Sequence, residues 1–173
     1  MYNPSSRLDF NDFIIKLSQE EVFLQCTEGL TPERRLGSFD QELVLRFFAF
    51  KNDRTNFKHD VDDFLTKYME KISDPDTAYP FDYEREKHIF LKTFSVLSST
   101  LEDRAFAFAN RARSDLARGF SIYHFESLTI GLQQHLDCID LNNQDMMERL
   151  KKVFMAINSE STPYAHNACK ISV

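Results

Sequence analysis

The stretch SFDQELVLRFFAFKND, residues 38–53, decides the fold class of this chain. In a helix built from it, apolar side chains point to almost every side between Leu43 and Phe50, with Arg46 in their middle. A helix that is apolar nearly all round is normally enclosed by other elements, and a buried arginine needs an acidic partner. Glu42 lies four residues before Arg46, in the favourable order for such a pair. The stretch therefore predicts an enclosed helix and a structural ion pair between Glu42 and Arg46.

The composition favours a mainly α protein with an aromatic core. The 173 residues include 17 Phe and 6 Tyr but no Trp, and only 4 Gly and 5 Pro. Average glycine usage is about 7%, so this chain has too few glycines for a fold rich in tight β-turns. A chain of this length buries roughly 70% of the surface that its unfolded form exposes. We expect one helical domain over residues 1–159 and a loose C-terminal tail over residues 160–173.

Apolar residues at helical spacing predict an irregular orthogonal bundle of six to seven helices. Capping boxes are expected at Ser18 and at Ser38, and N-caps at Ser121 and Asn142. The pattern weakens over residues 104–119, where arginine and alanine dominate. The expected helices cover residues 7–17, 18–26, 39–52, 61–72, 82–102, 121–136 and 142–157.

Charge and cysteine content limit the class of protein. The formal net charge of −6 argues against a chain that coats nucleic acid or anionic membrane over its whole surface. Three irregularly spaced cysteines, Cys26, Cys138 and Cys169, suit reduced thiols in a cytosol better than a disulfide framework. No run of about 18 apolar residues occurs that would span a membrane. We expect a cytoplasmic protein that neither crosses a membrane nor requires a cofactor.

An arginine-rich stretch is the candidate contact for nucleic acid. Its arginines are interleaved with Phe106 and Phe108. A guanidinium group pairs with phosphate in a fork geometry, and aromatic rings stack on bases. Asp103 and Asp115 dilute the positive charge, so the alternative is an ordinary solvated face. The candidate contact residues are Arg104, Arg111, Arg113 and Arg118.

Two HxxC pairs, His135 with Cys138 and His166 with Cys169, could supply the four ligands of a zinc ion. The alternative interpretation is that the first pair ends a helix and the second lies in the tail, and we predict no metal. Three neighbouring carboxylates could in principle ligate a hard cation. Their place at a predicted helix start favours complementation of the helix dipole instead. These carboxylates are Asp60, Asp62 and Asp63.

Residues 33–69 read ERRLGSFDQELVLRFFAFKNDRTNFKHDVDDFLTKYM. This block resembles the C-terminal helical half of the GmrSD-type restriction endonuclease N-terminal domain, a ParB/sulfiredoxin-related family of bacterial anti-phage proteins. A looser similarity covers residues 10–14 and 119–132, and so extends over most of the chain. The matching positions are Arg35, Asp40, Gln41, Glu42, Leu43, Val44, Leu45, Arg46, Phe47, Phe48, Ala49, Phe50, Phe57, Lys58, Phe64, Leu65 and Met69.

In that family an α/β portion carries a D-G-Q-Q-R motif associated with nucleotide-dependent nuclease action on foreign, often modified, DNA. The motif does not occur in this sequence, so the resemblance assigns no catalytic residue here. We expect the missing half on another polypeptide, or lost by truncation. Its removal would leave an apolar patch on the helix at residues 39–52, exposed or covered by self-association.

Three functions remain open from the sequence. The first is a non-catalytic helical module of a restriction or phage-defence protein, which supports partner docking or DNA placement. The second is a nuclease in its own right that uses the arginine-rich stretch at residues 104–118. The third is a stand-alone protein-interaction module on the same helical scaffold.

Overall fold

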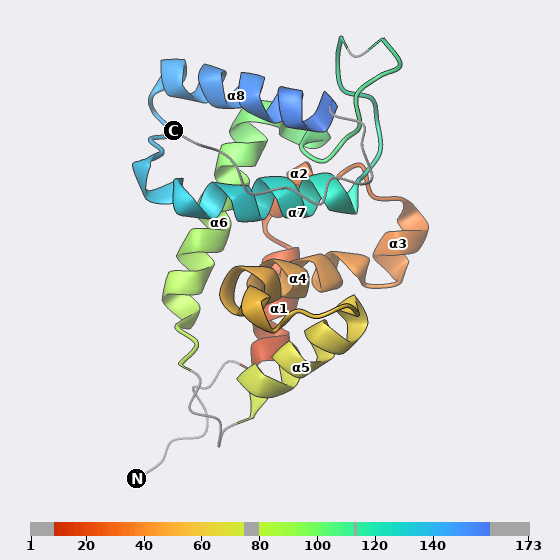
Figure 1. The fold of residues 1–173 in the computed structure, drawn as a ribbon, viewed down its shortest axis with the longest axis vertical. Coiled ribbons are helices and arrows are strands. Elements are labelled where there is room, and N and C mark those ends of the chain that lie inside the picture. Colours follow the sequence, from red (N-terminus) through yellow and green to blue (C-terminus); the bar gives the residue numbers. More distant parts are fainter. Residues whose placement is uncertain (1–8, 75–79, 113, 160–173) are drawn as a thin grey trace.

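The computed structural model describes residues 9–74, 80–112 and 114–159. These residues form a mainly α fold, as predicted, with an isolated bridge between Ala109 and Leu116 and no strand. None of their helices is long and apolar enough to cross a membrane. The predicted tail at residues 160–173 lies outside the described residues. The α-helices are α1 (Phe10–Ser18), α2 (Glu21–Cys26), α3 (Pro32–Leu36), α4 (Phe39–Asp53), α5 (Val61–Ser73), α6 (Tyr83–Leu101), α7 (Ile122–Gly131) and α8 (Gln144–Ser159) (Figure 1).

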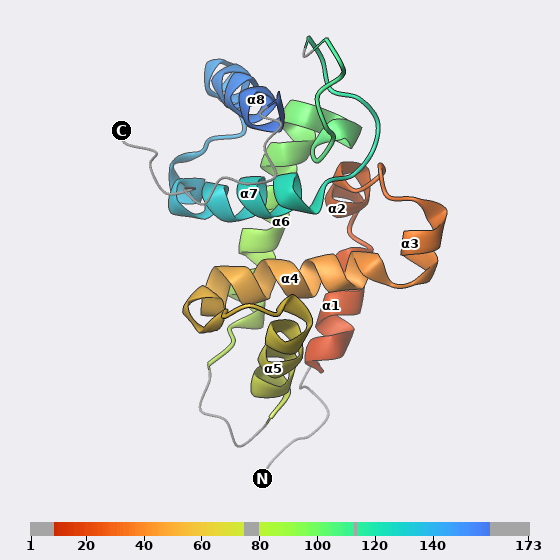
Figure 2. The same ribbon diagram turned by 45° about the vertical axis from the view of Figure 1, so that its right-hand side comes forward.

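The longest helix, α6, runs along the long axis of the molecule, and α4, α7 and α8 cross it (Figures 1 and 2). Helices α2 and α8 pack on α6, whereas α1, α3, α5 and α7 pack on α4. The crossing directions agree with the predicted orthogonal packing. Four 3₁₀ turns link these helices: η2 (Arg54–Asn56), η3 (Glu102–Arg104), η4 (Leu132–Gln134) and η5 (Leu136–Cys138).

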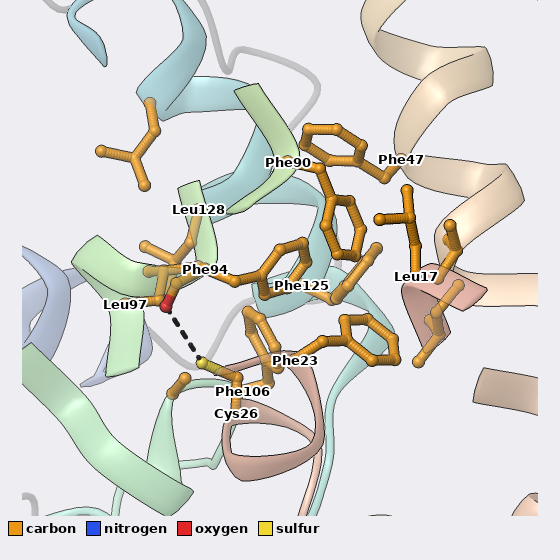
Figure 3. Packing of buried hydrophobic residues seen from close by; sticks show 14 of the residues in the cluster. Leu17, Phe23, Cys26, Phe47, Phe90, Phe94, Leu97, Phe106, Phe125 and Leu128 are labelled. Atoms are coloured by element: carbon orange, nitrogen blue, oxygen red, sulfur yellow. Dashed lines mark hydrogen bonds between the residues drawn. The ribbon is translucent and has the colours of Figure 1, made fainter. Parts of the chain in front are cut away.

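Phenylalanine rings build the centre of the core (Figure 3). The Phe90 ring of α6 lies 4.5 Å from that of Phe94 and 5.5 Å from those of Phe23 and Phe47, measured between centroids. These are the tilted and edge-to-face arrangements that aromatic rings prefer. Cys26 closes one side of the cluster and donates its thiol to the Phe94 carbonyl at 3.6 Å. Burial raises the pKa of Cys26 to about 12, so this thiol is a packing group.

Helix α4 is enclosed, as its sequence predicts. Leu43, Val44, Phe47, Phe48 and Ala49 are all 0% exposed, because neighbouring helices cover this helix on several sides. The prediction of an exposed apolar patch on this helix is therefore wrong. The large apolar side chains that are exposed in the described part of the chain lie on other elements: Leu24, Leu36, Phe108, Tyr123, Leu141 and Val153.

Two predicted capping boxes are wrong. Ser18 is the last residue of α1, and its hydroxyl donates to the Ile15 carbonyl at 2.8 Å. Ser38 precedes α4 in the left-handed region at φ 58° and makes no side-chain cap bond. Serine bonds its own backbone in several local geometries, so the spacing alone did not select the cap. The N-cap at Ser121 is confirmed, since its hydroxyl accepts from the His124 amide at 3.3 Å.

The described residues form eight α-helices instead of the predicted six to seven, and several boundaries differ: α1 begins at Phe10 instead of residue 7, and α2 begins at Glu21 instead of residue 18. Helix α3 was not predicted, because it spans five residues with no buried side chain and so has no apolar stripe. Helix α7 ends at Gly131 instead of residue 136, and the 3₁₀ turns η4 and η5 follow. The cap of α8 is Asn143, one residue after the predicted one, with its side chain accepting from the Met146 amide at 3.0 Å.

Candidate nucleic-acid interface

The arginine loop, defined as residues 104–118, links the end of α6 to the start of α7. It projects from one end of the molecule beside the C-terminal end of α8 (Figures 1 and 2). Its base is tied to the body on both sides. The Ser121 amide donates to the Phe106 carbonyl at 2.8 Å. The buried Asn158 of α8 donates its side-chain amide to the Ala105 carbonyl at 2.9 Å. The backbone carbonyl of Asn158 accepts from the Ala109 amide at 3.2 Å.

Backbone hydrogen bonds also join the two arms of the loop. The Ala117 amide donates to the Phe108 carbonyl at 2.7 Å, and the Asn110 amide donates to the Asp115 carbonyl at 2.7 Å. Together with the bridge between Ala109 and Leu116, these bonds hold the arms antiparallel. A loop ordered before it binds loses less conformational entropy on binding.

A close backbone contact joins Gly119, the residue after the arginine loop, to Gly29. A side-chain carbon at Gly29, just after α2, would collide with the carbonyl oxygen of Gly119. Glycine lets two backbones approach this closely. The end of α2 and the end of the arginine loop therefore pack directly on each other.

The four candidate arginines do not share one environment. Arg104 is held by Asp115 at 2.9 and 3.0 Å and also donates to the Leu116 carbonyl at 3.3 Å. The backbone amide of Leu116 and the Arg104 guanidinium lower the pKa of Asp115. Arg111 and Arg118 are exposed, and no acidic side chain of the described residues forms an ion pair with either. Arg113 lies outside the described residues.

The two phenylalanines of the loop also differ in exposure. Phe106 is 1% exposed and packs on Phe125 at 5.0 Å, whereas Phe108 is 53% exposed. Phe108 contacts the ring of His124 at 5.2 Å, and Tyr123, 46% exposed, contacts the same ring at 5.6 Å. Sequence reasoning missed Tyr123 and His124 because they begin α7, outside the arginine-rich stretch.

His124 is 2% exposed, and its Nδ1 has no hydrogen-bond partner among the described residues. Burial lowers the pKa of His124, and the nearby backbone of Ala107 and Phe106 opposes the shift only in part. The ring is therefore neutral at pH 7. It supports the exposed rings of Phe108 and Tyr123 from below the surface and adds no positive charge.

The predicted ion pair partners lie at the seam between α4 and α7. Arg46 contacts Glu42 at 2.7 Å and Glu126 at 2.8 Å, with 9% of its side chain exposed. Burial lowers the pKa of Arg46, but the hydrogen bonds of the two carboxylates outweigh burial and leave it above the ordinary value. Glu126 was missed by sequence reasoning. The available signal was that Glu126 is the one charged residue in an otherwise uncharged helix, IYHFESLTIG.

A second polar network, also missed, joins the end of α4 to α5 and α6. Lys51 contacts both carboxylate oxygens of Glu86 at 2.9 Å, and their side chains are 13% and 12% exposed. Asn52 donates to the Tyr68 hydroxyl at 3.1 Å. Each of these four side chains has a hydrogen-bond partner on another helix, so the network joins α4, α5 and α6.

The metal candidates do not assemble in the described residues, which contain no group of three His, Cys, Asp or Glu side chains suited to a metal ion. His135 and Cys138 are exposed beside two 3₁₀ turns, and the other pair, His166 with Cys169, lies outside the described residues. Asp60 accepts from the Asp63 amide at 3.0 Å as the N-cap of α5. Asp62 joins Asp63 in the first turn of that helix, where carboxylates complement its dipole.

One open groove, of about 430 Å³, lies between α6 and residues 139–142. A smaller hollow of about 120 Å³ is lined by Arg104, Asp115 and Lys151 at the base of the arginine loop. Within that hollow, one guanidinium nitrogen of Arg104 already contacts both carboxylate oxygens of Asp115.

Comparisons with family models, curated proteins and solved structures found no match to this chain. The resemblance of residues 33–69 to the GmrSD-type family therefore stays a prediction from the sequence.

Proposed function

We propose that this chain is a non-catalytic helical module of a restriction or phage-defence protein and that it supports DNA placement through the arginine loop. The resemblance of residues 33–69 to the GmrSD-type family supports the biological setting. The charge distribution supports the contact: residues 104–118 contain four arginines and one aspartate, a formal +3, in a chain of net charge −6. A local basic surface on an acidic protein is an electrostatic footprint for nucleic acid.

One observation carries the proposal. Arg111 and Arg118 are exposed on a loop whose arms are held by backbone hydrogen bonds, and no ion pair in the described residues neutralises them. Free guanidinium groups on an ordered loop can each take one phosphate without breaking an existing contact. The partner expected to supply catalysis is a separate nuclease half.

The test is duplex DNA binding measured by fluorescence anisotropy over a range of salt concentrations. The double variant Arg111→Ala/Arg118→Ala should bind at least tenfold more weakly than the parent, with a salt slope smaller by about two, because each lost phosphate contact removes about 0.9 from the slope. The matched control is Arg54→Ala/Arg85→Ala, which removes two exposed arginines from other elements. Equal losses in both double variants, or a parent that binds no DNA, would overturn the proposal.

The same samples test the alternative in which the chain is a nuclease. Plain and modified duplex DNA is incubated with the parent chain alone and with an added nuclease partner. Intact DNA with the chain alone is the expected result. Cleavage by the chain alone that is lost in Arg111→Ala/Arg118→Ala would establish the nuclease and remove the non-catalytic module.

A further inference from the structure

The exposed aromatic side chains of the described residues gather at one place, where the arginine loop meets α7. Phe108 and Tyr123 are the aromatic members of the exposed large apolar set, at 53% and 46% exposure. His124 lies between them, with ring centroids 5.2 Å from Phe108 and 5.6 Å from Tyr123. Phe108 and Tyr123 thus both pack on the buried ring of His124, and we term these three rings the ring platform.

Hydrogen bonds hold the backbone that carries the three rings. The Phe108 carbonyl accepts from Ala117, and the His124 amide donates to the Ser121 hydroxyl at the start of α7. Tyr123 and His124 lie in the first turn of that helix. The backbone of the ring platform is therefore ordered before any ligand arrives, and aromatic side chains give much contact area for little lost entropy.

His124 is an unusual support for two exposed rings. Only 2% of His124 is exposed, and its Nδ1 lacks a hydrogen-bond partner in the described residues, although native proteins satisfy nearly all such atoms. A leucine or phenylalanine would fill the same space without that cost. The buried imidazole is thus a polar group placed beneath an exposed aromatic surface.

We propose that Phe108 and Tyr123 stack on unpaired bases of single-stranded nucleic acid while Arg111 and Arg118 contact its phosphates. This inference rests on the proposed function and narrows its ligand. Aromatic stacking works on every base and is worth about 1–3 kcal/mol per base. In a duplex the faces of the bases are covered by their neighbours, so the rings have nothing to stack on. Positive charge beside exposed rings is the combination that single-stranded binding proteins use.

The experiment compares a labelled single-stranded oligonucleotide with the duplex of the same sequence. Phe108→Leu and Tyr123→Leu keep an apolar side chain but remove the ring. Each should weaken single-strand binding about tenfold or more, the lower part of the range for one lost stack, and leave duplex binding unchanged. Val153→Ala is the matched control, because it removes another exposed apolar side chain, at 51% exposure on α8. Melting temperatures verify that every variant is folded.

Phe108→Trp supplies a direct readout, because the chain has no tryptophan. Its fluorescence should be quenched by the single-stranded oligonucleotide and not by an abasic strand of equal length and charge. Quenching by the abasic strand would overturn stacking, since phosphate alone would then account for binding. Competition by poly-glutamate as strong as that by the oligonucleotide would also overturn it, and would identify a surface for acidic protein segments.

The outcomes separate this inference from the proposed function. If single strands and duplexes bind equally and the ring variants change neither, the ring platform is wrong while DNA placement by the arginines stands. If the parent binds neither form at low salt, both fail. Preferential binding of the single strand that depends on the rings and on Arg111 and Arg118 supports both.

Discussion

Arg46 and Arg118 show how differently one residue type can be used within a single chain. Both have uncharged neighbours on either side in the sequence, Leu45 and Phe47 for the first and Ala117 and Gly119 for the second. Arg46 is 7% exposed and held by two carboxylates. Arg118 is exposed, with no ion pair in the described residues.

The difference follows from what the fold places beside each guanidinium group. Around Arg46 the seam between α4 and α7 brings Glu126 in from 80 positions away. Arg118 lies one residue before the backbone contact of Gly119 with Gly29, and that contact brings no acidic partner to it among the described residues. An arginine whose charge is already neutralised stabilises the fold, and one whose charge is not is available to a ligand. Four substitutions test how far burial and pairing explain this difference.

Arg46→Ala should have the largest effect. We expect a loss of about 3 kcal/mol in the free energy of unfolding, the low end for breaking a buried pair from one side, because Glu42 and Glu126 keep about a third of their side-chain surface exposed. Urea denaturation measures the loss. Arg118→Ala should change stability by no more than about 0.5 kcal/mol. Equal stabilities of the two variants would remove the contrast.

Asn158→Ala should have the next largest effect, because it removes one of the two hydrogen bonds that join the arginine loop to Asn158 of α8 and leaves the other, from the Ala109 amide to the backbone carbonyl of residue 158. The buried Ala105 carbonyl loses its donor, and an unsatisfied buried group costs about 2 kcal/mol. Hydrogen exchange at the Ala109 and Ala117 amides should quicken as the loop loosens. Asn56→Ala, at an exposed asparagine, is the control. Unchanged exchange at both amides would mean that α8 does not order the loop.

Arg104→Ala tests the intermediate case, an arginine paired at the surface. Its partner Asp115 is 53% exposed in its side chain and Arg104 is 39% exposed, so the expected loss of stability is small and well below that for Arg46→Ala. The loss should shrink in high salt, because exposed pairs are screened. A loss above that for Arg46→Ala would show that burial does not set the order of these effects.

His124→Phe should have the smallest effect at neutral pH and show itself only on acidification. Burial lowers the pKa of His124 below the ordinary value of 6.5, so below about pH 6.5 the unfolded chain takes up a proton that the folded chain refuses. The parent should therefore lose stability as the pH falls from about 6.5 to the pKa of the folded state. Denaturation at about pH 7.5 and 5.5 should show a smaller loss in His124→Phe than in the parent. The exposed His88→Phe should behave as the parent, and a parental pH response in His124→Phe would contradict the prediction.

Elements with a long apolar stripe were predictable from sequence alone. Helix α5 covers Val61–Ser73 and α6 covers Tyr83–Leu101, close to the predicted 61–72 and 82–102. Each buries one face along its whole length, and that requirement is written in the spacing of its residues. Helix α3 buries nothing, so no such requirement marked it. The caps depend on one side-chain rotamer each, which is why Ser121 agreed and Ser18 did not.

The candidate interface was only half visible in the sequence. The clustering of arginines marked residues 104–118 as a candidate contact. Only the folded loop shows that Arg104 pairs with Asp115 and that Phe106 is buried in the core, so neither is available to a ligand. Tyr123 joined the interface because the start of α7 lies against Phe108 through His124. Neither relation has a periodic signature in the sequence, since both depend on where two elements meet.

The sequence by itself determined the helical class, the enclosure of α4 and the need of Arg46 for an acid, because burial of apolar surface and of charge is required wherever the helix packs. The folded chain was needed to show that Glu126 completes the pair and that Arg111 and Arg118 have no ion pair within the described residues. Such choices depend on contacts between residues far apart in the chain, as between Arg46 and Glu126, and these contacts exist only when the helices cross.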